Sequence, residues 1–181
     1  MKIEIEFKPI EKLKKKELDF MNVQRKREYG KSAMMNFRKE DKKAVFILVK
    51  DEGKVVAFGM LKPVKVEYKG KKYEILGMGR GLAIKKGREY GRLLQAARIY
   101  YMKKKDKTAV AFTDRSNLGF FEKVGFKTKR HLIKRFRYKN PKTGEIVIDN
   151  DGDGVYYEGK DKLVSKIIKG KGVAFTNADF W

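Results

Sequence analysis

Two apolar runs separated by a short polar turn constrain the fold of this chain most. AVFILV at 44–49 and VVAFGML at 55–61 each have the length of a strand, and DEGK at 51–54 joins them. Continuous apolar runs are typical of strands buried on both faces, so the pair predicts a covered hairpin. The 181 residues, 41% of them hydrophobic, are enough for one such domain with helices over the sheet.

The rest of the chain predicts strands interrupted by helices. An alternating strand at 3–7 precedes a helical segment that ends at Gly30, and a short second helix is expected within 31–43. The later elements are expected as strands at 64–68, 73–76 and 81–84, a helix at 91–105, a strand at 108–112, a helix at 116–124 capped by Asp114 or Ser116, a long strand at 127–139, strands at 146–148 and 155–157, a helix at 161–169 and a closing strand. This order predicts a mixed α/β fold with a largely antiparallel sheet.

The charge is strongly positive, with 46 Lys and Arg against 23 Asp and Glu, a net charge of +23. The excess is concentrated within 61–140. Such a field attracts anions, so a nucleic acid, a membrane surface, an acidic substrate or a polyphosphate cofactor would fit. A surface that is simply rich in lysine is the plain alternative.

Other features exclude several classes of site. The chain has no cysteine, which excludes disulfides, thiolate metal sites and cysteine nucleophiles, and the single His131 excludes a multi-histidine metal cluster. No apolar segment approaches the length of a membrane span, and the start MKIEIEFK is not a signal peptide. We therefore expect a cytoplasmic protein without a metal, of undetermined oligomeric state.

The segment AIKKGREYGRLLQAAR at 83–98 places a basic, glycine-containing loop before a helical pattern. A helix N-terminus offers free backbone N–H groups and partial positive charge, and glycine lets the backbone approach a ligand. Such a turn can hold a pyrophosphate, with charge from Lys85, Lys86, Arg88 and Arg92. Taken alone, the same residues also fit a turn in which Gly87 connects the strand to the helix and Gly91 lets the helix pack closely.

Two segments, the loop before the helix at 91–105 and the later FFEKVGF, together resemble the GNAT superfamily of acyl-CoA-dependent N-acetyltransferases. Arg88-Glu89-Tyr90-Gly91 matches the first four positions of the family pattern Arg/Gln-x-x-Gly-x-Gly/Ala, whose sixth position is Leu93 here. FFEKVGF at 120–126 is similar to the family's FYEKLGF ending. The resemblance covers roughly 44–130. It implies a splayed, mostly antiparallel central sheet flanked by helices, in a single domain over 1–181 with a C-terminal β/α extension at about 141–181.

The resemblance also implies a cofactor, acetyl-CoA or another acyl-CoA, and direct transfer of the acyl group to an amine. Backbone groups of Leu82, Ala83 and Ile84 would flank the pantetheine arm and the acyl carbonyl. Residues 88–92 would hold the pyrophosphate. The implied cofactor-binding residues are Leu82, Ala83, Ile84, Arg88, Glu89, Tyr90, Gly91, Arg92, Asn117 and Phe121. For Asn117, the family's usual spacing points to Asp114 instead.

Acyl transfer to an amine requires a base, a stabilised oxyanion and a proton for the departing thiolate. In the family the tyrosine of FYEKLGF commonly gives that proton, but Phe121 occupies the position and has no proton to donate. Either another acid such as Tyr90, Tyr100, Tyr101 or water replaces it, or the step tolerates the loss, or the reaction is lost or changed. The candidate catalytic residues are Glu74, Asp114 and Tyr90, and His131 has the pKa class of a general base.

The stretch KTKRHLIKRFRYK at 127–139 is the most basic segment that could meet a partner. As a strand, one face would carry a row of cations about 6.6–6.8 Å apart, a spacing that can follow a phosphate backbone. We predict anion or substrate binding by Lys127, Lys129, His131, Arg135 and Arg137. An edge strand protected by lysine is the alternative.

The sequence thus favours an acetyltransferase acting on an anionic or nucleic-acid-associated amine. The alternative is a GNAT-fold protein without acetyl transfer that binds or modifies nucleic acid through its basic face. DNDGDG at 149–154 matches the first half of an EF-hand loop, but Lys160 stands where the loop needs a glutamate. We expect this segment to be a hairpin turn, with a weak calcium site as the alternative.

Overall fold

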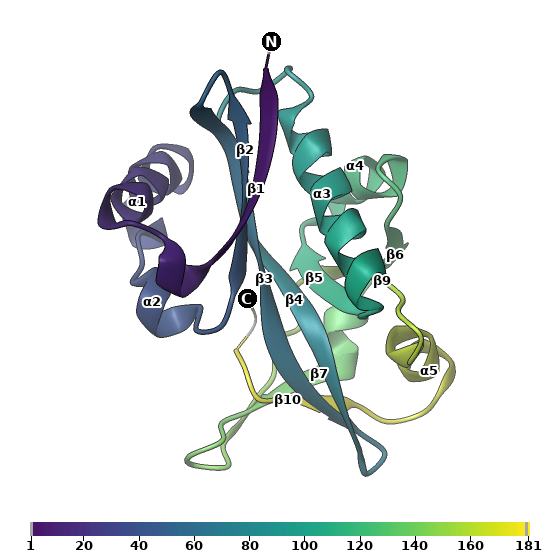
Figure 1. The fold of residues 1–181 in the computed structure, drawn as a ribbon. Helices are drawn as coiled ribbons and strands as arrows, with labels where there is room; N and C mark the ends of the chain where they lie inside the picture. Colours follow the sequence, from purple (N-terminus) through teal and green to yellow (C-terminus); the bar gives the residue numbers. More distant parts are fainter. Residues whose placement is uncertain (1, 180) are drawn as a thin grey trace. The chain divides into compact units, whose positions relative to one another are not determined.

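The computed structural model describes residues 2–179 and 181. The chain divides into two compact units, the first made of Met1–Lys62 and Gly79–Arg98 and the second of Pro63–Met78 and Ile99–Trp181. Strands β3 (Lys54–Tyr68) and β4 (Lys71–Ala83) and helix α3 (Tyr90–Lys105) each contribute residues to both units (Figure 1). Each unit is described by itself.

The first unit contains the predicted hairpin. Its other elements are β1 (Ile3–Pro9), the 3-10 helix η1 (Ile10–Lys12), α1 (Lys15–Tyr29), the 3-10 helix η2 (Lys31–Ala33), α2 (Phe37–Glu40) and β2 (Val45–Asp51). β2 pairs antiparallel with both β1 and β3, and Asp51 lies opposite Lys54 at the turn. Phe46 to Val49 are four consecutive buried residues, which confirms that both faces of this hairpin are covered.

Helix α1 ends where its sequence predicts, at Gly30. The Glu17 carboxylate accepts the backbone N–H of Lys14 at 2.7 Å, which satisfies one free donor at the N-terminus. Gly30 ends the helix with φ of 88°, a conformation that favours glycine. Within the part of the chain that is described, no helix is long and apolar enough to cross a membrane.

The second unit holds the remaining strands. Its elements, besides parts of β3, β4 and α3, are β5 (Ala109–Thr113), the 3-10 helix η3 (Arg115–Asn117), α4 (Leu118–Lys123), β6 (Lys127–Lys129), the 3-10 helix η4 (Leu132–Arg135), β7 (Phe136–Lys139), β8 (Ile146–Val147), β9 (Asp153–Tyr157), α5 (Leu163–Lys169) and β10 (Ala174–Thr176). The strand order is β6-β9-β5-β4-β3-β10-β7-β8. The pairs β4–β5 and β10–β7 are parallel, whereas β1–β2, β2–β3, β3–β10, β5–β9, β6–β9 and β7–β8 are antiparallel. A mixed, mostly antiparallel sheet with helices is therefore confirmed.

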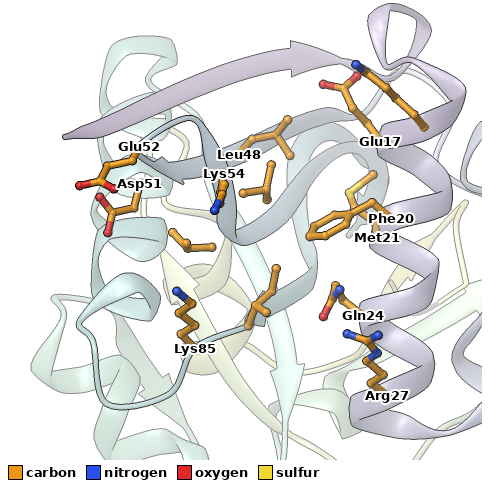
Figure 2. Close-up of a pocket in the computed structure, with 14 residues that line it drawn as sticks. Glu17, Phe20, Met21, Gln24, Arg27, Leu48, Asp51, Glu52, Lys54 and Lys85 are labelled. Atoms are coloured by element: carbon orange, nitrogen blue, oxygen red, sulfur yellow. The ribbon is translucent and has the colours of Figure 1, made fainter. Parts of the chain in front are cut away.

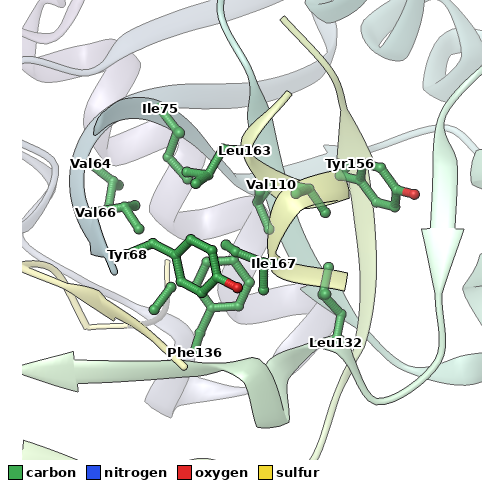
Figure 3. Packing of buried hydrophobic residues seen from close by; sticks show 12 residues of the cluster. Val64, Val66, Tyr68, Ile75, Val110, Leu132, Phe136, Tyr156, Leu163 and Ile167 are labelled. Carbon is green, nitrogen blue, oxygen red and sulfur yellow. The ribbon is translucent and has the colours of Figure 1, made fainter. Parts of the chain in front are cut away.

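The core of the second unit lies between its strands and α5. Tyr68 of β3, Phe136 of β7 and Ile167 of α5 pack together in it (Figure 3). The side chain of Trp181 packs against this cluster, and its indole N–H donates to the Val110 carbonyl at 2.7 Å. Ala178 and Trp181 thus pack against this core. The prediction of one domain over 1–181 stays a prediction.

The predicted long strand at 127–139 is wrong. β6 ends at Lys129, His131 adopts a left-handed φ of 55°, and a 3-10 helix follows before β7 begins at Phe136. Leu132 and Ile133 are both buried, although a strand would point two neighbouring side chains to opposite faces. Asp153 accepts the backbone N–H of His131 at 2.7 Å, which stabilises this break in the strand.

Two further local predictions are wrong. The segments around 146–148 and 155–157 do not form a hairpin, since β8 pairs with β7 while β9 pairs with β5 and β6. The N-cap positions of η3 and α4 are Asp114 and Asn117, and neither caps its helix with a side chain. Capping by Asp114 or Ser116 is therefore absent from these two helices.

Candidate functional site

The loop before α3 is the predicted phosphate cradle. Residues 85–89 are exposed, and the backbone is left-handed at Gly87 (φ 74°) and Glu89 (φ 58°). α3 begins at Tyr90, and the N–H of Leu93 donates to the Glu89 carbonyl at 3.0 Å, which closes the first turn. The N–H groups of residues 90–92 precede that bond and have no acceptor within the helix. They are available to an anion.

The basic residues around this loop differ in their pairing. Lys86 pairs with Glu28 at 2.6 Å, and Arg92 pairs with Glu89 at 3.1 Å. Lys85 and Arg88 are exposed and form no ion pair with any described residue. The loop therefore presents two uncompensated positive charges beside the helix N-terminus.

Tyr90 ties the start of α3 to the end of β2. Its side chain is buried, and its hydroxyl donates to Asp51 Oδ2 at 2.5 Å. This hydrogen bond to a carboxylate raises the pKa of Tyr90 above its ordinary value, with burial and the Asp51 charge adding to it. The proton of Tyr90, a candidate acid, is thus engaged by Asp51.

Strand β4 is kinked just before the predicted acyl-binding residues Leu82, Ala83 and Ile84. Arg80 has φ of 56°, a left-handed conformation inside a strand. Its guanidinium donates to both carboxylate oxygens of the fully buried Asp41, at 3.1 and 3.2 Å. Lys62 lies 3.7 Å from the same carboxylate. This bidentate pair holds the kink in place.

Tyr29, at the end of α1, reaches the same part of β4. Its hydroxyl donates to the carbonyl oxygen of Gly81 at 3.4 Å, and its ring stacks under Arg25, whose guanidinium carbon is 5.7 Å from the ring centre. Burial is the main reason that the pKa of Tyr29 is raised, so the hydroxyl stays protonated at neutral pH. A proton donor therefore lies beside the kink.

In the second unit, Asp114 and His131 line one polar pocket of about 490 Å³. Arg115 and Asp153 line it as well, and Arg115 Nε donates to the Asp153 carboxylate at 3.1 Å. The backbone N–H of His131 and this guanidinium hold the pKa of Asp153 below its ordinary value. Two residues predicted separately as bases are thus brought together.

The other predicted residues of the second unit lie in different surroundings. Glu74 is exposed, pairs with Lys107 at 3.1 Å and lines another pocket, of about 570 Å³. The amide of Asn117 donates to the Thr113 hydroxyl at 3.0 Å. Phe121 packs edge-to-face on Phe120 and Phe126, with ring centres 5.4 and 5.8 Å away.

The predicted row of cations at 127–139 does not exist as one strand face, because that strand is broken. Lys127 and Lys129 are exposed on β6. Arg135 instead donates to the carbonyls of Gly170 and Gly172 at 2.8 and 3.0 Å. Arg137 donates to the carbonyls of its own turn, at 3.0 Å for Lys134 and 2.9 Å for Phe136. Both guanidinium groups hold backbone in place.

Four residues near the β4 kink were not predicted from the sequence: Tyr29, Asp41, Arg80 and Arg98. Their roles depend on partners that are distant in the sequence. One local signal exists, because Gly59 interrupts the apolar run of β3, and a glycine inside a strand often marks a close approach by another group. That group is the Arg98 side chain, which lies over Gly59 and near Gly81.

Comparison with known proteins identifies the fold. No protein-family model and no curated protein matches the sequence. Among solved structures, the GNAT family N-acetyltransferase YhbS from Escherichia coli, in complex with CoA, aligns with a TM-score of 0.60 and 13% identity over 97% of this chain and 89% of that one. Escherichia coli ElaA aligns with a TM-score of 0.58 and 14% identity over 87% of this chain and all of the other.

A third structure, the PaiA N-acetyltransferase from Thermoplasma acidophilum in complex with coenzyme A, aligns with a TM-score of 0.50 and 17% identity over 87% of this chain and 99% of that one. The identities are low, so these likenesses concern the fold. The β4–loop–α3 segment and the FFEKVGF segment resemble the same family in sequence, in agreement with the likeness of the fold. The chain is a divergent example of the fold of the GNAT N-acetyltransferases.

Proposed function

We propose that this protein is an N-acyltransferase that takes an acyl group from acetyl-CoA, or another acyl-CoA, and transfers it directly to an amine. The observation that carries the proposal is the exposed loop 85–89, which joins kinked β4 to the free N-terminus of α3. Two solved structures with this fold are complexes with CoA. Their likeness supports CoA as the cofactor.

The residues of the loop fit a pyrophosphate. The N–H groups of residues 90–92 supply donors, and Lys85 and Arg88 supply positive charge, while the nearby Glu89 is paired with Arg92 and Asp51 accepts from Tyr90. Leu82, Ala83 and Ile84 would run along the pantetheine arm. The bound acyl-CoA supplies an acyl group activated as a thioester, and the chain has no cysteine through which an acyl-enzyme could form.

The proton steps have named candidates. Asp114 or His131 would accept the proton of the amine, with Glu74 as a third candidate. The thiolate of CoA would take its proton from Tyr29 or from water, because Phe121 has none and Tyr90 donates to Asp51. Each role can be tested by replacing the tyrosine with Phe, Asp114 or His131 with Asn, or Glu74 with Gln, and measuring the rate of acyl transfer.

The acceptor is proposed to be an anionic amine, on the basis of the net charge of +23. The alternative function, binding or modifying nucleic acid through a basic face, now has only that charge in its support, because the cations at 127–139 form no continuous row. Salt-dependent binding of a DNA or RNA oligonucleotide, in the absence of CoA binding, would favour the alternative.

Calorimetric titration with CoA and acetyl-CoA tests the proposal. The wild-type protein should bind both, and Gly91→Trp should abolish binding by filling the space beside the free N–H groups. Arg88→Glu should weaken binding by about tenfold or more, equivalent to ~1.4 kcal/mol, whereas Lys103→Glu, an exposed control on the last turn of α3, should not. No CoA binding, or wild-type affinity in Gly91→Trp, would contradict the proposal. Thiol release in the presence of a panel of amines then identifies the acceptor.

A further inference from the structure

A second concave site lies within the first unit, between α1 and the strands. The pocket has a volume of about 580 Å³, within the range of small-molecule sites. Figure 2 shows Phe20, Met21, Gln24 and Arg27 of α1 along one wall and Lys54 and Lys85 on the opposite side. Its wall is completed by residues of β2, of β3 and of the end of β4.

This pocket opens on the face of the strands that is turned away from α3. Val56 of β3 lines the pocket, whereas Gly59, three residues later, lies under the Arg98 side chain of α3. Side chains alternate between faces along a strand, so positions separated by three residues point to opposite sides. The pocket is therefore separate from the α3 face of the first unit.

The floor of the pocket is apolar. Met21, Leu48 and Val56 are buried beneath it, and Ile84 contributes from the end of β4. Phe20 stands at the mouth with 36% of its surface exposed. An apolar body entering the pocket would cover this ring.

The charges around the mouth are unbalanced. Lys16, Arg27, Lys54 and Lys85 line the pocket and form no ion pair with any residue in the described part of the chain. Three carboxylates also line the pocket. Glu17 is paired with Lys8 at 2.8 Å, whereas Asp51 accepts a hydrogen bond from the neutral hydroxyl of Tyr90 and keeps its charge, and Glu52 lies beside it on the Lys54–Lys85 side. The uncompensated positive charge is therefore on the α1 wall, at Lys16 and Arg27.

We propose that this pocket binds a small amphipathic anion, an apolar chain or ring that carries one carboxylate or phosphate group. The apolar body would lie on Phe20, Met21 and Val56, where it displaces water from apolar surface. The anionic group would lie at the mouth beside Arg27 on the α1 wall, where guanidinium donors face it. The inference does not rest on the proposed acyl transfer, because Phe20, Met21, Arg27 and Lys54 lie outside the proposed CoA site, although Ile84 and Lys85 line both.

Four eight-carbon probes separate the contributions: octanoate, octyl phosphate, octylamine and octanol. Calorimetry on the full chain should show binding of one or both anions and at least tenfold weaker binding of the amine and the alcohol. Arg27→Glu should weaken anion binding by about tenfold or more. Lys26→Glu is the matched control, because it reverses an exposed charge on the same helix at a residue that does not line the pocket.

The apolar contribution has its own test. Acetate should bind far more weakly than octanoate, and Phe20→Ser, which removes the ring without adding charge, should reduce octanoate affinity without a change in the far-ultraviolet circular dichroism of the protein. Binding of octanoate alone assigns a carboxylate ligand, and binding of octyl phosphate alone assigns a phosphate. Equal binding of all four probes, binding of none, or equal losses in Lys26→Glu and Arg27→Glu would each overturn the proposal.

Discussion

The guanidinium of Arg98 donates to the carbonyl oxygen of Gly79 at 2.6 Å, inside the first unit. It also reaches the Met60 carbonyl at 3.3 Å, and burial lowers the pKa of Arg98 to about 10. Gly79 directly precedes the left-handed Arg80, whose own side chain is held by Asp41. Two arginines therefore fix the kink in β4, one through the backbone and one through its side chain.

Gly59→Ala should disturb this arrangement. The added Cβ would overlap the Arg98 guanidinium and lie 3.3 Å from Leu94 Cδ2, so the guanidinium would have to leave the Gly79 carbonyl. We expect the free energy of unfolding to fall by about 1–3 kcal/mol, measured by urea denaturation. Gly119→Ala, in open space on α4, is the control and should gain up to about 1 kcal/mol. Equal effects of the two substitutions would contradict the role of Arg98.

Tyr90→Phe should loosen the loop before α3. The substitution removes the hydroxyl that donates to Asp51 and leaves the ring in place. We expect faster hydrogen exchange of the amides at 85–92 and an increase in the dissociation constant of CoA of about 2- to 10-fold. Unchanged exchange at 85–92 would show that the hydrogen bond does not hold the loop.

The sequence predicts the elements whose signals are local. The hairpin at 44–61, the end of α1 at Gly30 and the start of α3 follow from apolar runs, a glycine and helix-forming residues that are neighbours in the chain. The sequence signal for the loop at 85–89 is also local, since its glycine and basic residues are neighbours in the chain, so this candidate phosphate-binding loop could be predicted. Its backbone conformation agrees with that prediction, while its binding of a cofactor is untested.

The features that were missed depend on distant partners. The break at His131 is fixed by Asp153, which lies 22 residues further along the chain. The kink in β4 depends on Asp41, 39 residues before Arg80. Alternating basic and apolar residues at 127–139 fit a strand, but the burial of both Leu132 and Ile133 requires a turn that no local pattern distinguishes.

Phe121→Tyr tests what the family resemblance implies. Phe121 stands where FYEKLGF has its tyrosine, and its ring packs on Phe120 and Phe126. If protonation of the thiolate limits turnover, the new hydroxyl should raise kcat, by up to about 100-fold for a well-placed acid, without changing CoA affinity. The measurement is thiol release with a saturating amine. A change in CoA affinity alone would assign the position to binding.

Tyr29→Phe should act in the opposite direction. The substitution removes the hydroxyl beside the Gly81 carbonyl but keeps the ring under Arg25. We expect kcat to fall by about 10-fold or more while CoA affinity stays within twofold, because a general acid acts in the transition state. Unchanged kcat would exclude Tyr29 as the donor and leave Tyr100, Tyr101 or water in that role.

Asp153→Asn should reveal a pH-dependent contribution to stability. The Asp153 carboxylate accepts the His131 N–H at 2.7 Å and Arg115 Nε at 3.1 Å, and these contacts lower its pKa in the folded state. A group with a lowered folded pKa stabilises the protein fully above its unfolded pKa of about 3.9, and this stabilisation is lost as the pH falls through the folded pKa. At pH 6 the substitution should therefore cost about 1–3 kcal/mol.

The difference between wild type and Asp153→Asn should shrink toward pH 3 and below, because the wild-type carboxyl group then also becomes protonated. Urea denaturation at pH 6, 4 and 3 measures this difference directly. Asp151→Asn, at an exposed position two residues before β9 begins, is the control and should show neither the loss at pH 6 nor the pH dependence. A difference that stays constant with pH would mean that Asp153 stabilises the His131 turn through its shape and neutral hydrogen bonding, without a contribution from its charge.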